Sequence, residues 1–251
     1  MIVLQPVLEI YSPDDFTLWP VAESAPYGFL PLNGALDAAE VGTAVMRIAD
    51  CNNIDPADDD RPPRPTDPLG GFLHGLLTMD DLFASGGLRI TDTQTGTTLL
   101  PGCCNGLEER RDWLEVLDGD GWASFGHDPS PLAERLGEII RLTVDAEQDD
   151  SPMIELPVIE LRRLLADAER DLIDFLQLAA AWTAQLLPDH AIHVTAALAR
   201  ALDLPAPLVP PVLPAEGTDR CGVVEPGVQA VAECWESSVR QPMESRRCAP
   251  D

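Results

Sequence analysis

The sequence predicts an α+β fold, in which a small, mainly antiparallel sheet packs against a long C-terminal amphipathic helix and a shorter helix. Short runs of alternating apolar residues indicate strands, and one long run with apolar residues every three or four positions indicates a helix. The chain has 251 residues, of which 45% are hydrophobic, enough to fill a sizeable core. We expect one α+β domain over residues 1–204 and a proline-rich, disordered, flexible tail over residues 205–251.

The first third of the chain predicts one strand, one mixed segment and one exposed loop. Residues 2–11 have the character of a strand, and four prolines interrupt any period in the stretch that follows. Residues 36–50 begin with a helical pattern and then alternate over residues 43–48, which predicts a helix followed by a strand. Residues 53–69 interleave aspartates with prolines, so we expect an exposed, mobile, acidic loop.

The middle of the chain predicts a hairpin and a helix. Residues 88–100 alternate on both sides of a polar turn ending in Gly96, which is typical of a β-hairpin. Asn105 and Glu108 have the spacing of a capping box, in which each would satisfy a free N–H of a helix start. A helix is therefore predicted over residues 106–117, with apolar contacts from Leu107, Trp113, Leu114 and Leu117.

The last part of the predicted domain is mostly helical. Residues 131–136 follow the cap residue Ser130, begin with a proline at the first helical position and precede Gly137 at the C-cap, which predicts a short helix. Residues 138–145 alternate and predict a strand. Apolar residues at spacings of three and four from position 161 to 186 predict a long amphipathic helix, and a second helix is expected over residues 192–202. The long helix should pack on a sheet that contains both the hairpin and the strand 138–145.

The charge of the chain restricts its partners. The formal net charge is −27, because 43 acidic residues face 16 basic ones, all of which are arginine. Such a field disfavours nucleic acid and anionic membranes, and it permits a basic protein partner. The N-terminus lacks the basic start of an export signal, and no apolar run is long enough to span a bilayer. We therefore expect a cytoplasmic protein whose six cysteines are mostly reduced thiols.

Two adjacent cysteines form the most unusual local feature. Cys103 and Cys104 lie between a predicted strand end and a predicted helix start, where helix N–H groups favour a thiolate. One hypothesis makes Cys104 a nucleophile that works with His127 and Asp128, provided that folding brings them together. The alternative, which the sequence favours, is that both cysteines are small buried side chains at a tight turn and that Asp128 is a turn residue.

A metal site is the third alternative for these residues. It would recruit Cys103, Cys104 and His127, with Cys51 or His74 as a further ligand. Adjacent cysteines and isolated histidines do not have the close spacing that zinc sites usually show, so no metal and no cofactor are expected. The candidate functional residues at this stage are Cys103, Cys104, Asn105, Glu108, Trp113, His127 and Asp128.

A resemblance to other proteins accompanies these residues. The block LLPGCCNGLEERRDWLEVLDG, followed by GHDPSP, a strand and a long helix, resembles uncharacterised proteins of high-GC actinomycetes over residues 87–187. The order of elements and the acidity also resemble, loosely, the SUKH-type immunity proteins, which bind and neutralise toxins. The net charge and the absence of a recognised catalytic motif predict an acidic, non-enzymatic, intracellular module that binds a protein partner, and the resemblance implies an immunity-type role against a basic partner. The alternatives are a hydrolase or transferase that uses Cys104, His127 and Asp128, and a structural or regulatory module without a basic partner.

Overall fold

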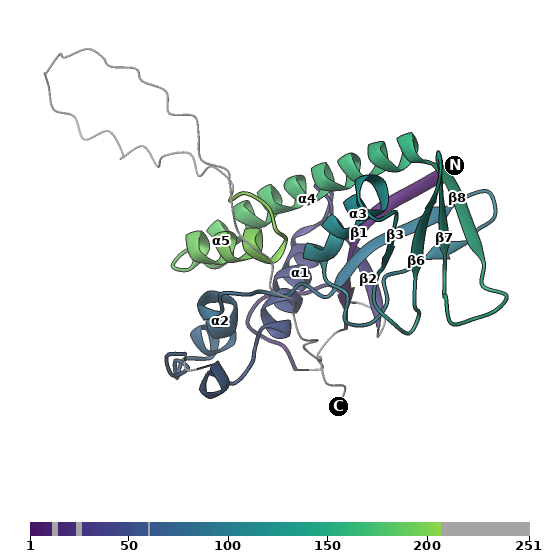
Figure 1. The fold of residues 1–251 in the computed structure, drawn as a ribbon. Coiled ribbons are helices and arrows are strands. Elements are labelled where there is room, and N and C mark those ends of the chain that lie inside the picture. The colour runs from purple at the N-terminus through teal and green to yellow at the C-terminus, as the bar shows by residue number, and fades with distance from the viewer. Residues whose placement is uncertain (12–14, 24–26, 60, 207–251) are drawn as a thin grey trace, which may run out of the picture. The chain divides into compact units, whose positions relative to one another are not determined.

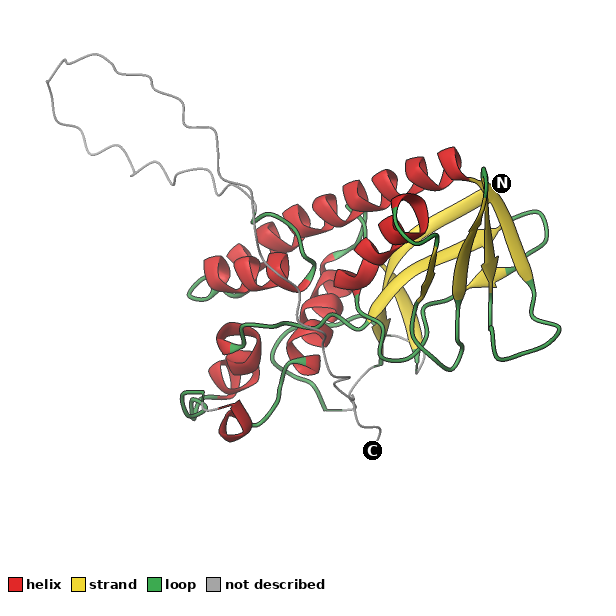
Figure 2. Cartoon of the chain, viewed as in Figure 1, coloured by secondary structure: helices red, strands yellow, loops and turns green. Residues whose placement is uncertain are grey.

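The fold is α+β, as predicted, but its strands form two antiparallel sheets instead of one. A computed structural model describes residues 1–11, 15–23, 27–59 and 61–206, and the predicted tail lies almost entirely outside these residues. Within them, each sheet has four strands, and helices pack between and beside the sheets (Figures 1 and 2). No helix in these ranges is long and apolar enough to cross a membrane.

The first sheet is built around the N-terminal strand. Its order is β2-β1-β3-β4, formed by β1 (Ile2–Ile10), β2 (Gly28–Pro31), β3 (Gly86–Asp92) and β4 (Thr98–Leu99). The strand over residues 2–11 and the hairpin over residues 88–100 are thus confirmed. Leu4 pairs with Ile90, and Ile90 pairs with Leu99, which places these three buried side chains on the same face.

The second sheet is a meander of β5 (Trp122–Ser124), β6 (Leu132–Leu136), β7 (Ile139–Thr143) and β8 (Met153–Pro157). The strand over residues 138–145 is confirmed as β7, whereas the predicted helix over residues 131–136 is wrong, because this segment is β6. Gly137 has φ +69° and forms the tight turn between β6 and β7. A glycine with positive φ suits a hairpin turn as well as a helix end, and pairing with β7 decides between them.

Helix α1 (Ala38–Cys51) replaces the predicted helix-to-strand segment. Asp37 and Glu40 form a capping box at its start, and every residue from Val41 to Ala49 is buried. The polar residues of α1 recur at spacings of three and four (Glu40, Thr43, Arg47 and Asp50), which is the period of a helix, so the strand predicted over residues 43–48 is wrong. The following loop is exposed over residues 62–68, as predicted, although it contains a 3₁₀ turn at Pro56–Asp59 and leads into α2 (Pro68–Thr78).

The predicted helix over residues 106–117 forms in two pieces, and its capping box is absent. A 3₁₀ helix, η2 (Leu107–Arg111), precedes α3 (Asp112–Asp118), and the N-cap of η2 is Gly106 without a side-chain cap bond. Asn105 is buried, and its Nδ2 donates to the Gly86 carbonyl at 2.7 Å. Asn105 therefore connects this segment to β3 instead of capping a helix.

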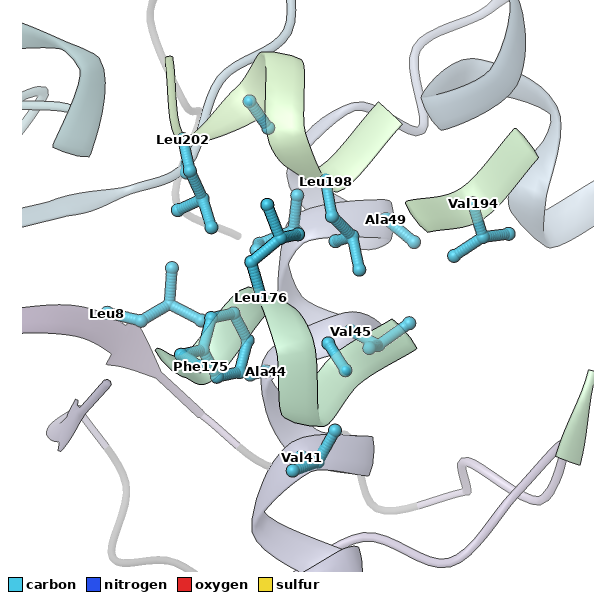
Figure 3. Close-up of a cluster of buried hydrophobic side chains, with 14 of the residues drawn as sticks. Leu8, Val41, Ala44, Val45, Ala49, Phe175, Leu176, Val194, Leu198 and Leu202 are labelled. Carbon is cyan, nitrogen blue, oxygen red and sulfur yellow. The ribbon is translucent and has the colours of Figure 1, made fainter. Parts of the chain in front are cut away.

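The two sheets share one long helix. Helix α4 (Val158–Leu186) and helix α5 (Ala191–Ala201) confirm the two predicted helices. The N-terminal half of α4 packs with α3 and the inner faces of both sheets. Its C-terminal half packs with α1, α2 and α5, where Phe175 and Leu176 lie between Leu8 of β1 and the side chains of α1 and α5 (Figure 3). The long helix thus joins two hydrophobic cores.

Candidate functional site

The two adjacent cysteines lie in an extended segment, residues 101–106, that follows β4 and leads into η2. Backbone bridges hold this segment on both sides. Cys103 bridges to His127 in the connection between β5 and β6, and Gly106 bridges to Ser85 at the start of β3. The segment is therefore fixed between the two sheets, and the direction of the cysteine side chains is set by backbone hydrogen bonds.

The bridge to His127 requires a very close approach of two chain segments. The amide of Gly102 donates to the Phe125 carbonyl at 2.8 Å, and the amide of Cys103 donates to the His127 carbonyl at 2.5 Å. A Cβ on Gly102 would lie 2.3 Å from the Pro129 carbonyl oxygen, so only glycine fits there. Gly126 has φ +95°, which turns the β5–β6 connection toward the cysteines. These two glycines explain why His127 meets Cys103.

The side chains of Cys103, Cys104 and His127 converge, and we call these three residues the thiol site. Their sulfur and ring nitrogen atoms all lie within 4.8 Å of one another, and the two sulfur atoms are 3.4 Å apart. The Nδ1 of His127 lies 3.4 Å from the Oδ2 of Asp128. Cys104 and Asp128 both have positive φ, +64° and +49°, a conformation that is uncommon outside glycine and is often found at functional sites.

The thiol site faces solvent. Cys103 is exposed, Cys104 is half-buried, and the side chains of His127 and Asp128 are 58% and 87% exposed. The expectation that both cysteines are buried at a tight turn is therefore wrong, because the backbone bridge to His127 directs Cys103 outward. An exposed pair of thiols beside an imidazole can bind a thiophilic metal ion or react with an electrophile.

The other predicted candidates do not join the thiol site. Asn105 is buried and holds the segment to β3, as described above. Trp113 is 2% exposed and stacks on Phe125 with ring centroids 4.1 Å apart, so it belongs to the core. Cys51 lies in α1 and His74 is buried in α2, and neither is part of the cluster.

Glu108 lies close to the thiol site in sequence but has a different environment. The pKa of its carboxyl group is raised to about 7, mainly by burial and also by the negative charge of Glu109, while hydrogen bonds from the backbone N–H groups of Glu108 and Ala84 oppose the rise. One carboxyl oxygen, Oε2, is buried and has no hydrogen-bond partner among the described residues. The carboxyl group accepts from the backbone N–H of Ala84 in the segment before β3, and it is not one of the converging groups of the thiol site.

A second candidate surface, which sequence analysis missed, is the outer face of the second sheet. The inner face of this sheet is buried, whereas four large apolar side chains on the outer face are exposed by 37% to 58%: Trp122, Leu136, Ile139 and Met153. Cross-strand pairs place Glu134 beside Trp122, Arg141 beside Glu134, and Glu155 beside Arg141. The outer face is therefore a mixture of apolar and mainly acidic side chains.

Acidic residues continue from this sheet toward the thiol site. The loop between β7 and β8, residues 144–152, contains four of them: Asp145, Glu147, Asp149 and Asp150. Hydrogen bonds join this loop to Ser130 in the β5–β6 connection, since Asp145 accepts from the Ser130 amide and the Ser130 hydroxyl donates to Glu147. The loop and the His127 turn thus lie at the same end of the second sheet.

Comparison of the chain with protein-family models, with curated proteins and with solved structures gave no match.

Proposed function

We propose that this chain is a binding module that recognises a basic protein partner through the outer face of its second sheet. The observation that carries the proposal is the set of exposed apolar side chains on this face, led by Trp122 and Met153 at 58% and 57% exposure. The apolar side chains alternate with charged ones, since Glu134 and Arg141 lie between Trp122 and the strand of Met153, and tryptophan is enriched where interfaces gain most of their binding energy.

The charge around this face suits a basic partner. Glu134 and Glu155 flank Arg141 on the face itself, and the acidic loop over residues 144–152 lies at one end of the sheet. With a net charge of −27, the chain would attract a cationic protein over long range and speed its association. An immunity-type role, in which the partner is a basic toxin or nuclease, is the form of this function that agrees with the resemblance described above.

The proposal is tested by affinity capture with matched variants. The face variant is Trp122→Ser with Met153→Ser, and the control is Leu186→Ser with Ile192→Ser, two exposed apolar residues at the junction of α4 and α5. We expect the wild type and the control to retain a basic protein that the face variant does not retain. The same protein should be released when added salt shortens the electrostatic screening length from about 10 Å to about 3 Å. Equal retention by the two variants would contradict the proposal.

A thiol enzyme is the second candidate function. The convergence of Cys104, His127 and Asp128 favours it, since a hydrolase or transferase of this type needs a nucleophile, a base and a carboxylate that orients the base. The groups lie at an exposed surface, whereas two surface hollows of the described residues lie elsewhere, one over β1 and β3 and one beside residues 53–64. The face variant leaves the thiol site intact, so the capture experiment tests the first candidate independently of the second.

A further inference from the structure

The thiol site offers a donor set that suits a metal ion. Two cysteine sulfurs and one imidazole nitrogen are ligands that zinc prefers, and they are poor ligands for magnesium or calcium, which select oxygen. The donor atoms come from two segments that are far apart in the sequence, the adjacent cysteines and the turn of His127, and the backbone bridge brings these segments together. This inference is independent of the proposed protein-binding face.

The distances between the donors are close to those of a tetrahedral site. Zn–S bonds of about 2.3 Å and Zn–N bonds of about 2.0–2.1 Å place two tetrahedral sulfur ligands about 3.8 Å apart, and a sulfur and a nitrogen about 3.5 Å apart. The two sulfur atoms lie 3.4 Å apart, slightly closer than this, and the whole set falls within 4.8 Å. Bringing the most distant donor atoms to tetrahedral separations needs a movement of about 1 Å. Cys103 and His127 are exposed, so their side chains can rotate without repacking the core.

The surroundings of the site also favour a cation. The Oδ2 of Asp128 lies 3.4 Å from the Nδ1 of His127 and can accept a hydrogen bond from it, and in that tautomer Nε2 is the nitrogen with a free lone pair. A carboxylate that orients a histidine ligand in this way is a common feature of zinc sites. The acidic loop over residues 144–152, joined to Ser130, adds negative charge to the same end of the sheet.

We propose that Cys103, Cys104 and His127 bind one zinc ion, with Asp128 as the residue that positions His127. Binding releases the two thiol protons to solvent, so the site gains a divalent cation and loses two protons. The fourth coordination position stays open to water or to a ligand atom from another molecule. A zinc ion here would tie the cysteine segment to the β5–β6 connection through side chains as well as through the backbone.

The experiment uses the full chain with Cys221, Cys234 and Cys248 changed to serine, so that only the thiols of the described residues remain. Under a reductant that carries no thiol, the chain is titrated with Co²⁺, a spectroscopic substitute for Zn²⁺, and then with Zn²⁺ in competition with a coloured chelator. We expect one Co²⁺ per chain, a thiolate-to-cobalt charge-transfer band, the visible bands of a tetrahedral ion, and displacement by one Zn²⁺.

Matched variants decide the assignment. Cys104→Ser and His127→Ala should weaken Zn²⁺ binding by more than about 100-fold, whereas Asp128→Asn should weaken it by about 10- to 100-fold, as expected of an outer residue. Cys51→Ser and His193→Ala, outside the cluster, should leave it unchanged. Absence of the charge-transfer band in the wild-type site would overturn the proposal, and so would an unchanged Zn²⁺ affinity in His127→Ala. Because the His127 side chain is exposed, we expect His127→Ala to fold like the wild type. Equal unfolding midpoints of the two proteins would show that weaker binding is not caused by loss of folding.

Discussion

Glu108 is the residue whose chemistry departs most from its ordinary behaviour. Burial raises the pKa of its carboxyl group from 4.5 to about 7, and Oε2 has no hydrogen-bond partner in the described part of the chain. The folded state therefore holds a proton that the unfolded state releases at a lower pH. The stability gained from binding this proton in the folded state is fully present below pH 4.5 and is lost as the pH rises through 7. Above that pH, the fold contains a partly buried negative charge.

Glu108→Gln should remove this penalty, because glutamine resembles the protonated acid at every pH. A rise in pKa from 4.5 to about 7 corresponds to at most about 3 kcal/mol at 1.36 kcal/mol per pH unit. We expect the free energy of unfolding of the variant, measured with urea, to exceed that of wild type by about 1–3 kcal/mol at pH 8 and to equal it at pH 4. The exposed control Glu169→Gln should show no such difference between the two pH values. A variant less stable than wild type at pH 8 would contradict the assigned cause.

Sequence reasoning located the cysteines and His127 but could not place them together. Their contact depends on a backbone bridge between Cys103 and His127, which are 24 positions apart and belong to no common element. The signal available in the sequence was the pair of glycines, Gly102 and Gly126, which are needed for the close approach. Trp122 was missed for a related reason. Its exposure is decided by the sheet that it belongs to, and β5 is only three residues long.

At the scale of elements, periodicity predicted the long helix and misjudged two short segments. Helix α4 has one buried stripe and one solvent face, so its 3.6-residue period is clear in the sequence. Helix α1 also has a helical period, but the six residues 43–48 are too few to separate it from alternation, and the polar Arg47 is buried. Strand β6 is short, and the serine and proline before it are typical of a helix start. Its weak alternation becomes decisive only because it pairs with β7.

The stripe of α4 gives the element-scale prediction. Leu172 is completely buried in the core shared with α1 and α5, and Asp174 is exposed on the opposite side of the helix. Leu172→Ala removes buried apolar contact and leaves a cavity, so we expect it to lower the free energy of unfolding by about 2–5 kcal/mol. Asp174→Ala should change it by less than about 0.5 kcal/mol. Chemical denaturation measures both, and equal midpoints would show that the wrong face of the helix has been assigned to the core.

At the scale of the whole molecule, the predicted single sheet became two because the hairpin and β7 pair with different neighbours. Strand β3 pairs with β1, which begins near the N-terminus, and β7 pairs with β6 and β8 from its own part of the chain. Apolar patterns identify strands but carry little information about pairing partners. The N-terminal half of the long helix packs in the core that contains both sheets, and its C-terminal half packs in the core that contains α1 and α5. The helix therefore packs on both the hairpin and β7, as predicted, although these strands belong to different sheets.

The net charge gives the whole-molecule prediction. With 43 acidic residues and 16 arginines, repulsion among carboxylates should oppose the compact state at neutral pH. Raising salt from about 0.01 M to about 0.15 M shortens the screening length from about 30 Å to about 8 Å, so it weakens this long-range repulsion more than it weakens close pairs such as Arg141 with Glu155. We expect the thermal unfolding midpoint to rise over this range at pH 7. Near the sequence isoelectric point of about 4.2, where the charges balance, the same change in salt should have little effect. A midpoint that falls with salt at pH 7 would mean that the surface ion pairs outweigh the repulsion, and the acidity would then stabilise the fold instead of opposing it.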